Sequence, residues 1–202
     1  MRKTPQQYKR LSVKETIEKI LGDTKTVLTP LSITTSESLH DEFTTTDFSF
    51  SIGGEKKEIV DLKDQKGKGL IDGLFTGLHK HFSEEYRSLE KIRLVDLKVN
   101  PIISSSKASL GTDSQASVLF SVHVHGHGLA EFQHKSRSMI YSSFVLALEA
   151  FQFYINCERV FDKIQLVIAD AQTRNRGDTI NRAMYDLSKI TEVNTYEKKG
   201  KS

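Results

Sequence analysis

The clearest alternation of apolar and polar residues runs through residues 116–125. Four apolar side chains share one face of this stretch: Val118, Phe120, Val122 and Val124. A period of two predicts a strand of an antiparallel sheet with one packed face. A preceding strand is predicted around residues 92–99, and a short strand around Phe132 follows the glycine turn at 126–128.

The preceding part of the chain repeats this order of elements. Phe48 and Phe50, a glycine pair at 53–54 and apolar residues at 59–62 predict a β-hairpin. A helix is predicted next, over residues 70–82. Its apolar residues recur at helical spacing and predict a core face: Leu70, Ile71, Leu74, Phe75, Leu78 and Phe82.

A second core helix is predicted to begin near Ser136 or Ser138 and to end near Cys157. One face of it is apolar: Ile140, Phe144, Leu148, Phe151 and Ile155. Phe75 and Phe144 occupy corresponding mid-helix positions, and a hairpin precedes each helix. We therefore predict an α+β fold of duplicated hairpin-plus-helix (ββα-type) units, with a mainly antiparallel sheet and helices on one face.

The flanking segments predict shorter elements. A capping box at Ser12–Glu15 predicts the start of a short helix that ends at Gly22. Residues 24–46 are rich in serine and threonine and predict an irregular arm. Near the C-terminus, residues 163–169 predict one further strand, and Asp178 predicts the cap of a last helix.

These elements divide the chain into three parts. Residues 1–43 form an N-terminal helix and arm. Residues 44–160 form the α+β domain, with repeat units at about 44–90 and 91–158. Residues 161–202 form a C-terminal strand and helix extension. A length of 202 residues suits one domain with such appendages.

Composition and charge narrow the class of protein. The 29 basic residues nearly balance 26 acidic ones, which gives no electrostatic case for nucleic acid binding. A single cysteine excludes a disulfide framework and favours a reducing compartment. No apolar run approaches the roughly 18 residues of a membrane span, and the N-terminus lacks a signal-peptide core. We expect a soluble, cytoplasmic protein without a membrane partner.

Three segments together resemble a known family. They are GKGLIDGLF at 67–75, DLKVNPII at 96–103 and LGTDSQASV at 110–118. Their order and spacing are similar to those of the C-terminal regulatory (allosteric and dimerisation) domain of 2-isopropylmalate and citramalate synthases, enzymes of branched-chain amino-acid biosynthesis. The resemblance spans about Thr44 to Tyr154. The chain has no room for the catalytic barrel of those enzymes.

The resemblance implies a non-catalytic domain that binds a small branched-chain effector, such as leucine or isoleucine, without a cofactor. It implies a homodimer, with a catalytic synthase chain as a further partner. The effector-binding residues that it implies are Gly67, Gly69, Leu70, Ile71, Leu94, Leu97, Pro101, Ser136 and Ser138. Residues 67–69 before a helix start could hold an anion on free amides, or could simply form a tight entry loop. Because the same loop lines the effector pocket in the family, the resemblance implies carboxylate binding by the amides of Gly69 and Leu70.

The sequence departs from the family pattern at the effector site. Leu70 replaces the family's proline, Leu97 replaces its tyrosine, and residues 134–137 are bulkier and more basic than its glycine-rich loop. These changes could shrink or close the pocket. Two alternatives therefore stay open: an interaction scaffold, or a separate regulatory subunit of a synthase that has lost the effector site.

Catalytic and metal-binding alternatives have less support. His123 and His125 lie two apart on a strand and could bind zinc or nickel, but no third ligand lies at suitable spacing, and a solvated strand face explains them as well. Cys157 ends an apolar helix, where a buried thiol is common. Asp113 lies in a predicted turn. We expect no catalytic residues, no metal and no enzyme activity from the chain alone.

Overall fold

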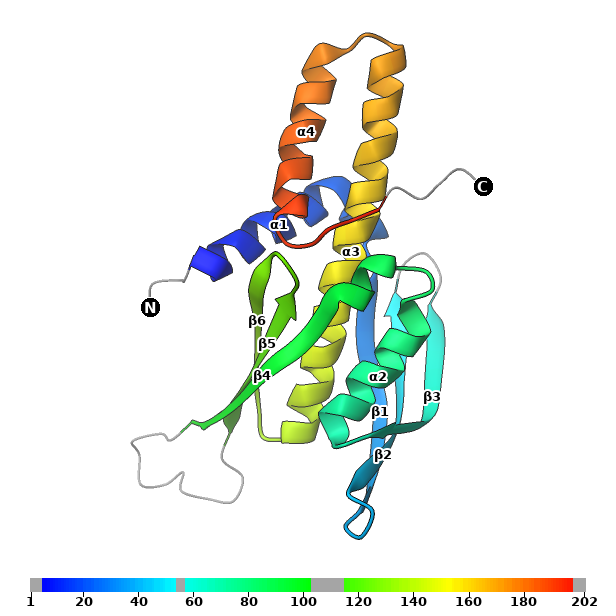
Figure 1. The fold of residues 1–202 in the computed structure, drawn as a ribbon, viewed down its shortest axis with the longest axis vertical. Coiled ribbons are helices and arrows are strands. Elements are labelled where there is room, and N and C mark those ends of the chain that lie inside the picture. Colours follow the sequence, from blue (N-terminus) through cyan, green and yellow to red (C-terminus); the bar gives the residue numbers. More distant parts are fainter. Residues whose placement is uncertain (1–4, 54–56, 103–114, 198–202) are drawn as a thin grey trace.

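The structure is a computed structural model that describes residues 5–53, 57–102 and 115–197. Within these ranges it contains four α-helices and two antiparallel sheets of three strands each (Figure 1). In both sheets the strands are adjacent in space in the order in which they follow in sequence. The predicted α+β class and the antiparallel strands are confirmed.

The first sheet lies between two helices in sequence. Helix α1 (Pro5–Leu21) precedes it, and strands β1 (Val27–Ser38), β2 (Phe43–Gly53) and β3 (Glu58–Gly67) form it. Helix α2 (Leu70–Phe82) follows directly and packs against β2 and β3. The predicted hairpin over residues 48–62 corresponds to β2 and β3.

The second sheet is also followed directly by a helix. Strands β4 (Ile92–Pro101), β5 (Ala116–Val124) and β6 (Gly128–Ser136) form it. Helix α3 (Met139–Thr173) then continues for 35 residues. The strands predicted at 92–99, at 116–125 and around Phe132 are therefore confirmed. Residues 103–114, between β4 and β5, lie outside the described residues.

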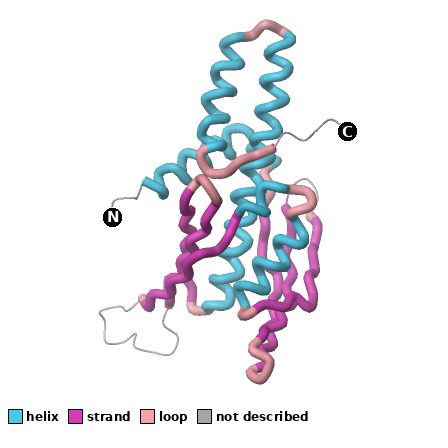
Figure 2. Tube along the Cα trace, in the orientation of Figure 1, coloured by secondary structure: helices cyan, strands magenta, loops and turns pink. Residues whose placement is uncertain are grey.

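Helix α3 lies between the two sheets (Figures 1 and 2). It contacts β1 on one side and β5 and β6 on the other. Its C-terminal part and helix α4 (Gly177–Thr191) form a helical hairpin that projects from the sheets. The arrangement differs from the predicted single combined sheet with helices on one face, because α3 separates two sheets.

Phenylalanine pairs connect each helix with the central strand of the other sheet. Phe75 of α2 lies 6.2 Å from Phe120 of β5, between ring centroids. Phe144 of α3 lies 5.5 Å from Phe48 of β2. All four rings are buried, and each aromatic pair adds about 0.5–1.5 kcal/mol beyond the burial of its area. The two halves therefore share one hydrophobic core.

Side-chain amides of α3 also hold the start of β1. The Asn156 side chain accepts a hydrogen bond from the Thr26 backbone N–H and donates one to the Thr26 carbonyl, both at 2.8 Å. The Gln152 side-chain oxygen accepts from the Leu28 N–H at 2.8 Å. A buried strand edge needs such partners for its backbone groups. The helix thus satisfies part of the edge of the first sheet.

The N-terminal region contains two corrections to the sequence analysis. Helix α1 begins at Pro5, so Ser12–Glu15 lies in mid-helix and is not its start. Residues 24–46, predicted as an irregular arm, mostly form β1 and the beginning of β2. Threonine is common in strands, and several of these threonines are buried, including Thr44 and Thr46.

The predicted strand at residues 163–169 is wrong, because this segment belongs to α3. Ile164 is buried and Ile168 packs against the core, four residues further along, and helix α3 packs against α4. Packing against α4 outweighs the β propensity of the local sequence. The last helix is confirmed as α4. Asp178 lies in its first turn, and the cap is Arg176.

Replacing Gly67 with alanine should destabilise the fold. A Cβ at this position would lie 2.5 Å from the backbone nitrogen of Gly73 in α2, which cannot move alone. Overpacking of this kind typically costs about 1–3 kcal/mol. Urea unfolding measures the loss. Gly69→Ala is the matched control, since nothing lies within 4 Å of its added Cβ, and equal stability of the two variants would contradict the predicted clash.

Candidate functional site

A groove separates α2 from β4. Helix α2 packs on the first sheet, whereas β4 is an edge strand of the second sheet. Two pockets lie along this groove, with volumes of about 850 Å³ and 390 Å³. They share three lining residues: Ile71, Asp72 and Leu97. The volumes lie in the range of small-molecule sites.

An irregularity in β4 shapes one wall of the groove. The register with β5 shifts between Leu94 and Asp96, which leaves Val95 as an extra, exposed residue. Before the shift, Leu94 faces the same side as the core residue opposite it. After the shift, Leu97 and Val99 face that side. The bulge thus directs apolar side chains from both halves of β4 towards the groove.

The smaller pocket lies at the N-terminus of α2. No side chain caps this end of the helix. The Asp72 carboxylate accepts a hydrogen bond from the Lys68 N–H at 2.9 Å, outside the helix. The first amides of a helix have no partner within it, and they carry partial positive charge. Lys68, Gly69 and Leu70 line the pocket beside these amides.

The other walls of the smaller pocket are apolar. Leu97 and Val99 come from β4, and Met139 and Ile140 come from the first turn of α3. All four side chains are partly exposed, between 37% and 53%. The pocket therefore combines an anion-binding helix end with an apolar interior.

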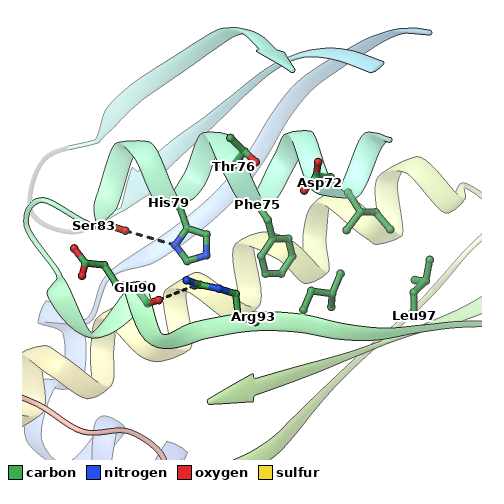
Figure 3. Close-up of a pocket in the computed structure, with 10 residues that line it drawn as sticks. Asp72, Phe75, Thr76, His79, Ser83, Glu90, Arg93 and Leu97 are labelled. Carbon is green, nitrogen blue, oxygen red and sulfur yellow. Dashed lines mark hydrogen bonds between the residues drawn. The ribbon is translucent and has the colours of Figure 1, made fainter. Parts of the chain in front are cut away.

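The larger pocket extends along α2 towards its C-terminus (Figure 3). Phe75, Leu94 and Ile71 form its apolar part. At its polar end, Arg93 of β4 lies below His79 of α2. The Arg93 Nη1 group donates hydrogen bonds to the backbone carbonyls of Glu90 at 2.6 Å and Ile92 at 2.7 Å, which fix the guanidinium in place.

His79 is half-buried, and its environment disfavours the charged imidazole. The pKa of His79 is lowered to about 4, mainly by burial and also by the positive charge of Arg93, while a hydrogen bond to the Ile92 backbone opposes both. The ring packs edge-to-face on Phe151, 4.9 Å between centroids, and its Nδ1 lies 3.5 Å from the Ser83 hydroxyl. His79 is therefore neutral at pH 7.

The structure gathers several of the residues predicted for effector binding, but not all of them. Gly69, Leu70, Ile71 and Leu97 line the smaller pocket, and Leu94 lines the larger pocket together with Ile71 and Leu97. The remaining predicted residues line neither: Gly67, Pro101, Ser136 and Ser138.

These remaining residues have structural contacts instead. Gly67 permits the close approach of β3 to α2. Pro101 pairs with Ala116 of β5 at the end of β4. Ser138 is the N-cap of α3 and accepts a hydrogen bond from the Tyr141 N–H at 3.1 Å, and Ser136 donates to the Ser138 carbonyl at 2.7 Å.

Many residues that line the pockets could not be selected from the sequence, among them His79, Arg93, Val99 and the first residues of α3. A single charged residue beside an apolar pattern does not by itself indicate a binding site, because its role depends on which element faces it in the fold. The alternation in β4 could have indicated Val99, if the bulge at Val95 had been known.

The histidine pair does not join a metal cluster in the part of the chain that the structure describes. His123 pairs with Arg93 across the strands, and His125 is exposed after the end of β5. Among the described residues, no group of three or more histidine, cysteine, aspartate or glutamate side chains is placed to hold a metal ion.

Cys157 is fully buried in α3, and burial raises the pKa of its thiol. Such a thiol packs as a small hydrophobic side chain. Asp113 lies outside the described residues.

The groove of this α+β protein thus contains two adjoining pockets of small-molecule size. Comparison of the sequence with known proteins yields no matching family model and no matching curated protein. Across residues 5–53, 57–102 and 115–197, no helix combines the length and apolar character needed to cross a membrane.

Replacing His79 with glutamine should reduce the loss of stability in acid. The unfolded chain protonates this imidazole near pH 6.5, whereas the folded protein does so only at about pH 4. Between these values the unfolded state binds more protons, so the free energy of unfolding of the wild type decreases as pH falls. Urea unfolding at several pH values measures this slope.

The difference between the wild type and His79→Gln should change with pH below 6.5 and stay constant above about pH 7.5. Parallel stability curves for the two proteins down to pH 4 would contradict the assignment to His79.

Proposed function

We propose that this protein is a non-catalytic effector-binding domain that takes a branched-chain amino acid in the smaller pocket. The observation that carries the proposal is the position of the pocket: an apolar cavity ends at the uncapped N-terminus of α2. A branched-chain amino acid has the same two parts, a compact apolar side chain and a charged head.

The head group has suitable partners at the helix end. The free amides at the start of α2 donate to a carboxylate, and the dipole of the helix favours its negative charge. Lys68 lines the same end of the pocket. The carboxylate of Asp72 also lines it and offers an acceptor to the ammonium group.

The apolar walls set the size and chemistry of the side chain. Leu97, Val99, Met139 and Ile140 surround it with aliphatic groups from two elements. A volume of about 390 Å³ suits a free amino acid better than a nucleotide or a polymer. Leucine and isoleucine are therefore the first ligands to test.

The order of the elements supports a duplicated unit. Each sheet is a three-stranded meander followed by a helix, and each helix places a phenylalanine on the central strand of the other sheet. The unit differs from the predicted hairpin-plus-helix by one strand. A duplicated unit is also what the resemblance to the synthase regulatory domain implies.

A homodimer is part of the same proposal, because a site near a two-fold interface allows ligand occupancy to change subunit geometry. Exposed apolar side chains lie beside the groove, among them Met139 and Ile140. Sedimentation equilibrium should give about twice the 22.9 kDa of one chain. A monomer at all concentrations, with or without leucine, would contradict this part of the proposal.

Leucine or isoleucine should stabilise the protein, by about 2.7 kcal/mol at 100 times the dissociation constant. Calorimetric titration measures the affinity. Val99→Glu should abolish binding, because it places a carboxylate in the apolar pocket near the ligand's own carboxylate. Val95→Glu is the matched control: the residue lies on the same strand, is 54% exposed and lines neither pocket.

Wild-type protein that binds none of the branched-chain amino acids would overturn the effector proposal. Equal affinity in Val99→Glu and wild type would show that leucine binds elsewhere.

One observation favours a second candidate, an interaction scaffold or regulatory subunit of a separate synthase chain. The α3–α4 hairpin that projects from the sheets in Figure 1 carries exposed large apolar side chains: Leu166, Met184 and Tyr185. Such side chains suit a protein partner. Binding of leucine by the isolated chain distinguishes the effector domain from a scaffold that has lost the ligand.

A further inference from the structure

The larger pocket has a chemistry of its own. Its polar end contains Arg93, His79 and Ser83, and its apolar part contains Phe75, Leu94 and residues shared with the smaller pocket. At about 850 Å³ it has roughly twice the volume of the smaller pocket. The proposed effector leaves this space without a role, together with Arg93, the only lysine or arginine among the described residues that line it.

Arg93 is preorganised for an anion. Its Nη1 group is held by the carbonyls of Glu90 and Ile92. Among the described residues, no carboxylate forms an ion pair with Arg93. The side chain of Glu90 points away from the guanidinium in Figure 3. The remaining N–H groups of a fixed guanidinium suit a carboxylate, which accepts two parallel hydrogen bonds.

The neighbours of Arg93 limit the charge of the ligand. His79 is neutral at pH 7 and adds a polar ring without a second positive charge. Asp72 and Glu90 also line the pocket and repel further negative charge. One cation among these groups favours a single carboxylate and disfavours phosphate esters or nucleotides.

The apolar part limits the shape of the ligand. Phe75 lies next to the polar end in Figure 3, and Leu94 directly follows Arg93 on β4. Ile71 and Leu97 line both this pocket and the smaller one. A ligand that covers these side chains needs an extended apolar body attached to its head group. An added peptide strand fits less well, because the bulge at Val95 interrupts the pairing edge of β4.

We infer that the larger pocket binds a monocarboxylate with an extended apolar body, such as a medium-chain acyl carboxylate, with the carboxylate on Arg93 and the chain along Phe75, Leu94 and Leu97. The carboxylate position at Arg93 is distinct from the proposed effector site, although Ile71, Asp72 and Leu97 line both pockets. The inference does not depend on whether the smaller pocket binds leucine.

Calorimetric titration with octanoate tests the inference, and octan-1-ol, which has the same chain without the charge, is the ligand control. The wild type should bind octanoate at least about tenfold more tightly than octanol, since a charge-assisted contact to arginine is lost with the alcohol. Equal affinities, or no saturable octanoate binding, would overturn the inference without any variant.

Two variants locate the carboxylate. Arg93→Gln should weaken octanoate binding by about tenfold or more. Lys98→Gln is the matched control, because it also removes a cation from β4. The Lys98 side chain lines neither pocket and forms an ion pair with Asp96 at 2.9 Å. Circular dichroism of both variants checks the fold.

Val99→Glu separates the two sites, because Val99 lines only the smaller pocket. It should abolish leucine binding and leave octanoate binding intact. Loss of octanoate binding in Val99→Glu with retention in Arg93→Gln would place octanoate in the smaller pocket and overturn the inference. Failure of leucine alone would overturn only the proposed function.

Discussion

The packing of α3 between two sheets is the interaction on which the rest of the structure depends. Neither three-stranded sheet has a partner sheet, so each must bury its apolar face against helices. Helix α3 provides that surface to both sheets. The pair Phe75–Phe120 connects α2 with the second sheet, and the pair Phe144–Phe48 connects α3 with the first sheet. Its amide side chains at Asn156 and Gln152 also replace a missing neighbour for β1.

This core explains where the groove lies. Helix α2 is positioned by its packing on the first sheet, and β4 is positioned by its pairing in the second sheet. The two elements therefore face each other where the two halves of the protein meet. The polar end and the apolar interior of the pockets both come from this junction. A binding site between two halves that share one core can respond to small changes in how the halves pack.

The sequence predicted the elements whose periodicity is strong. The strands of the second sheet and the helices around Phe75 and Phe144 were recognisable because their apolar residues repeat every two or every three to four positions. The strand β1 was missed, because its serines and threonines are also typical of loops. The segment 163–169 was misassigned, because its apolar residues are also compatible with a strand. The packing of α4 beside it, which favours the helix, cannot be seen in the local sequence.

The candidate site was predictable only in part, for a related reason. The glycine loop and Leu97 belong to local motifs that the sequence shows directly. Arg93 and His79 form part of the site only because two elements that are distant in sequence face each other. The bulge at Val95 changes which residues face inward, and a uniform alternation cannot reveal it.

The length of α3 has a mechanical consequence. Met139 and Ile140, at one end, form a wall of the smaller pocket, and the other end carries the projecting hairpin with α4. A continuous helix of 35 residues is about 52 Å long at 1.5 Å per residue. A tilt of about 5° at the pocket therefore displaces the far tip by about 4–5 Å. A small change in the direction of α3 at the groove would therefore be largest at the projecting hairpin.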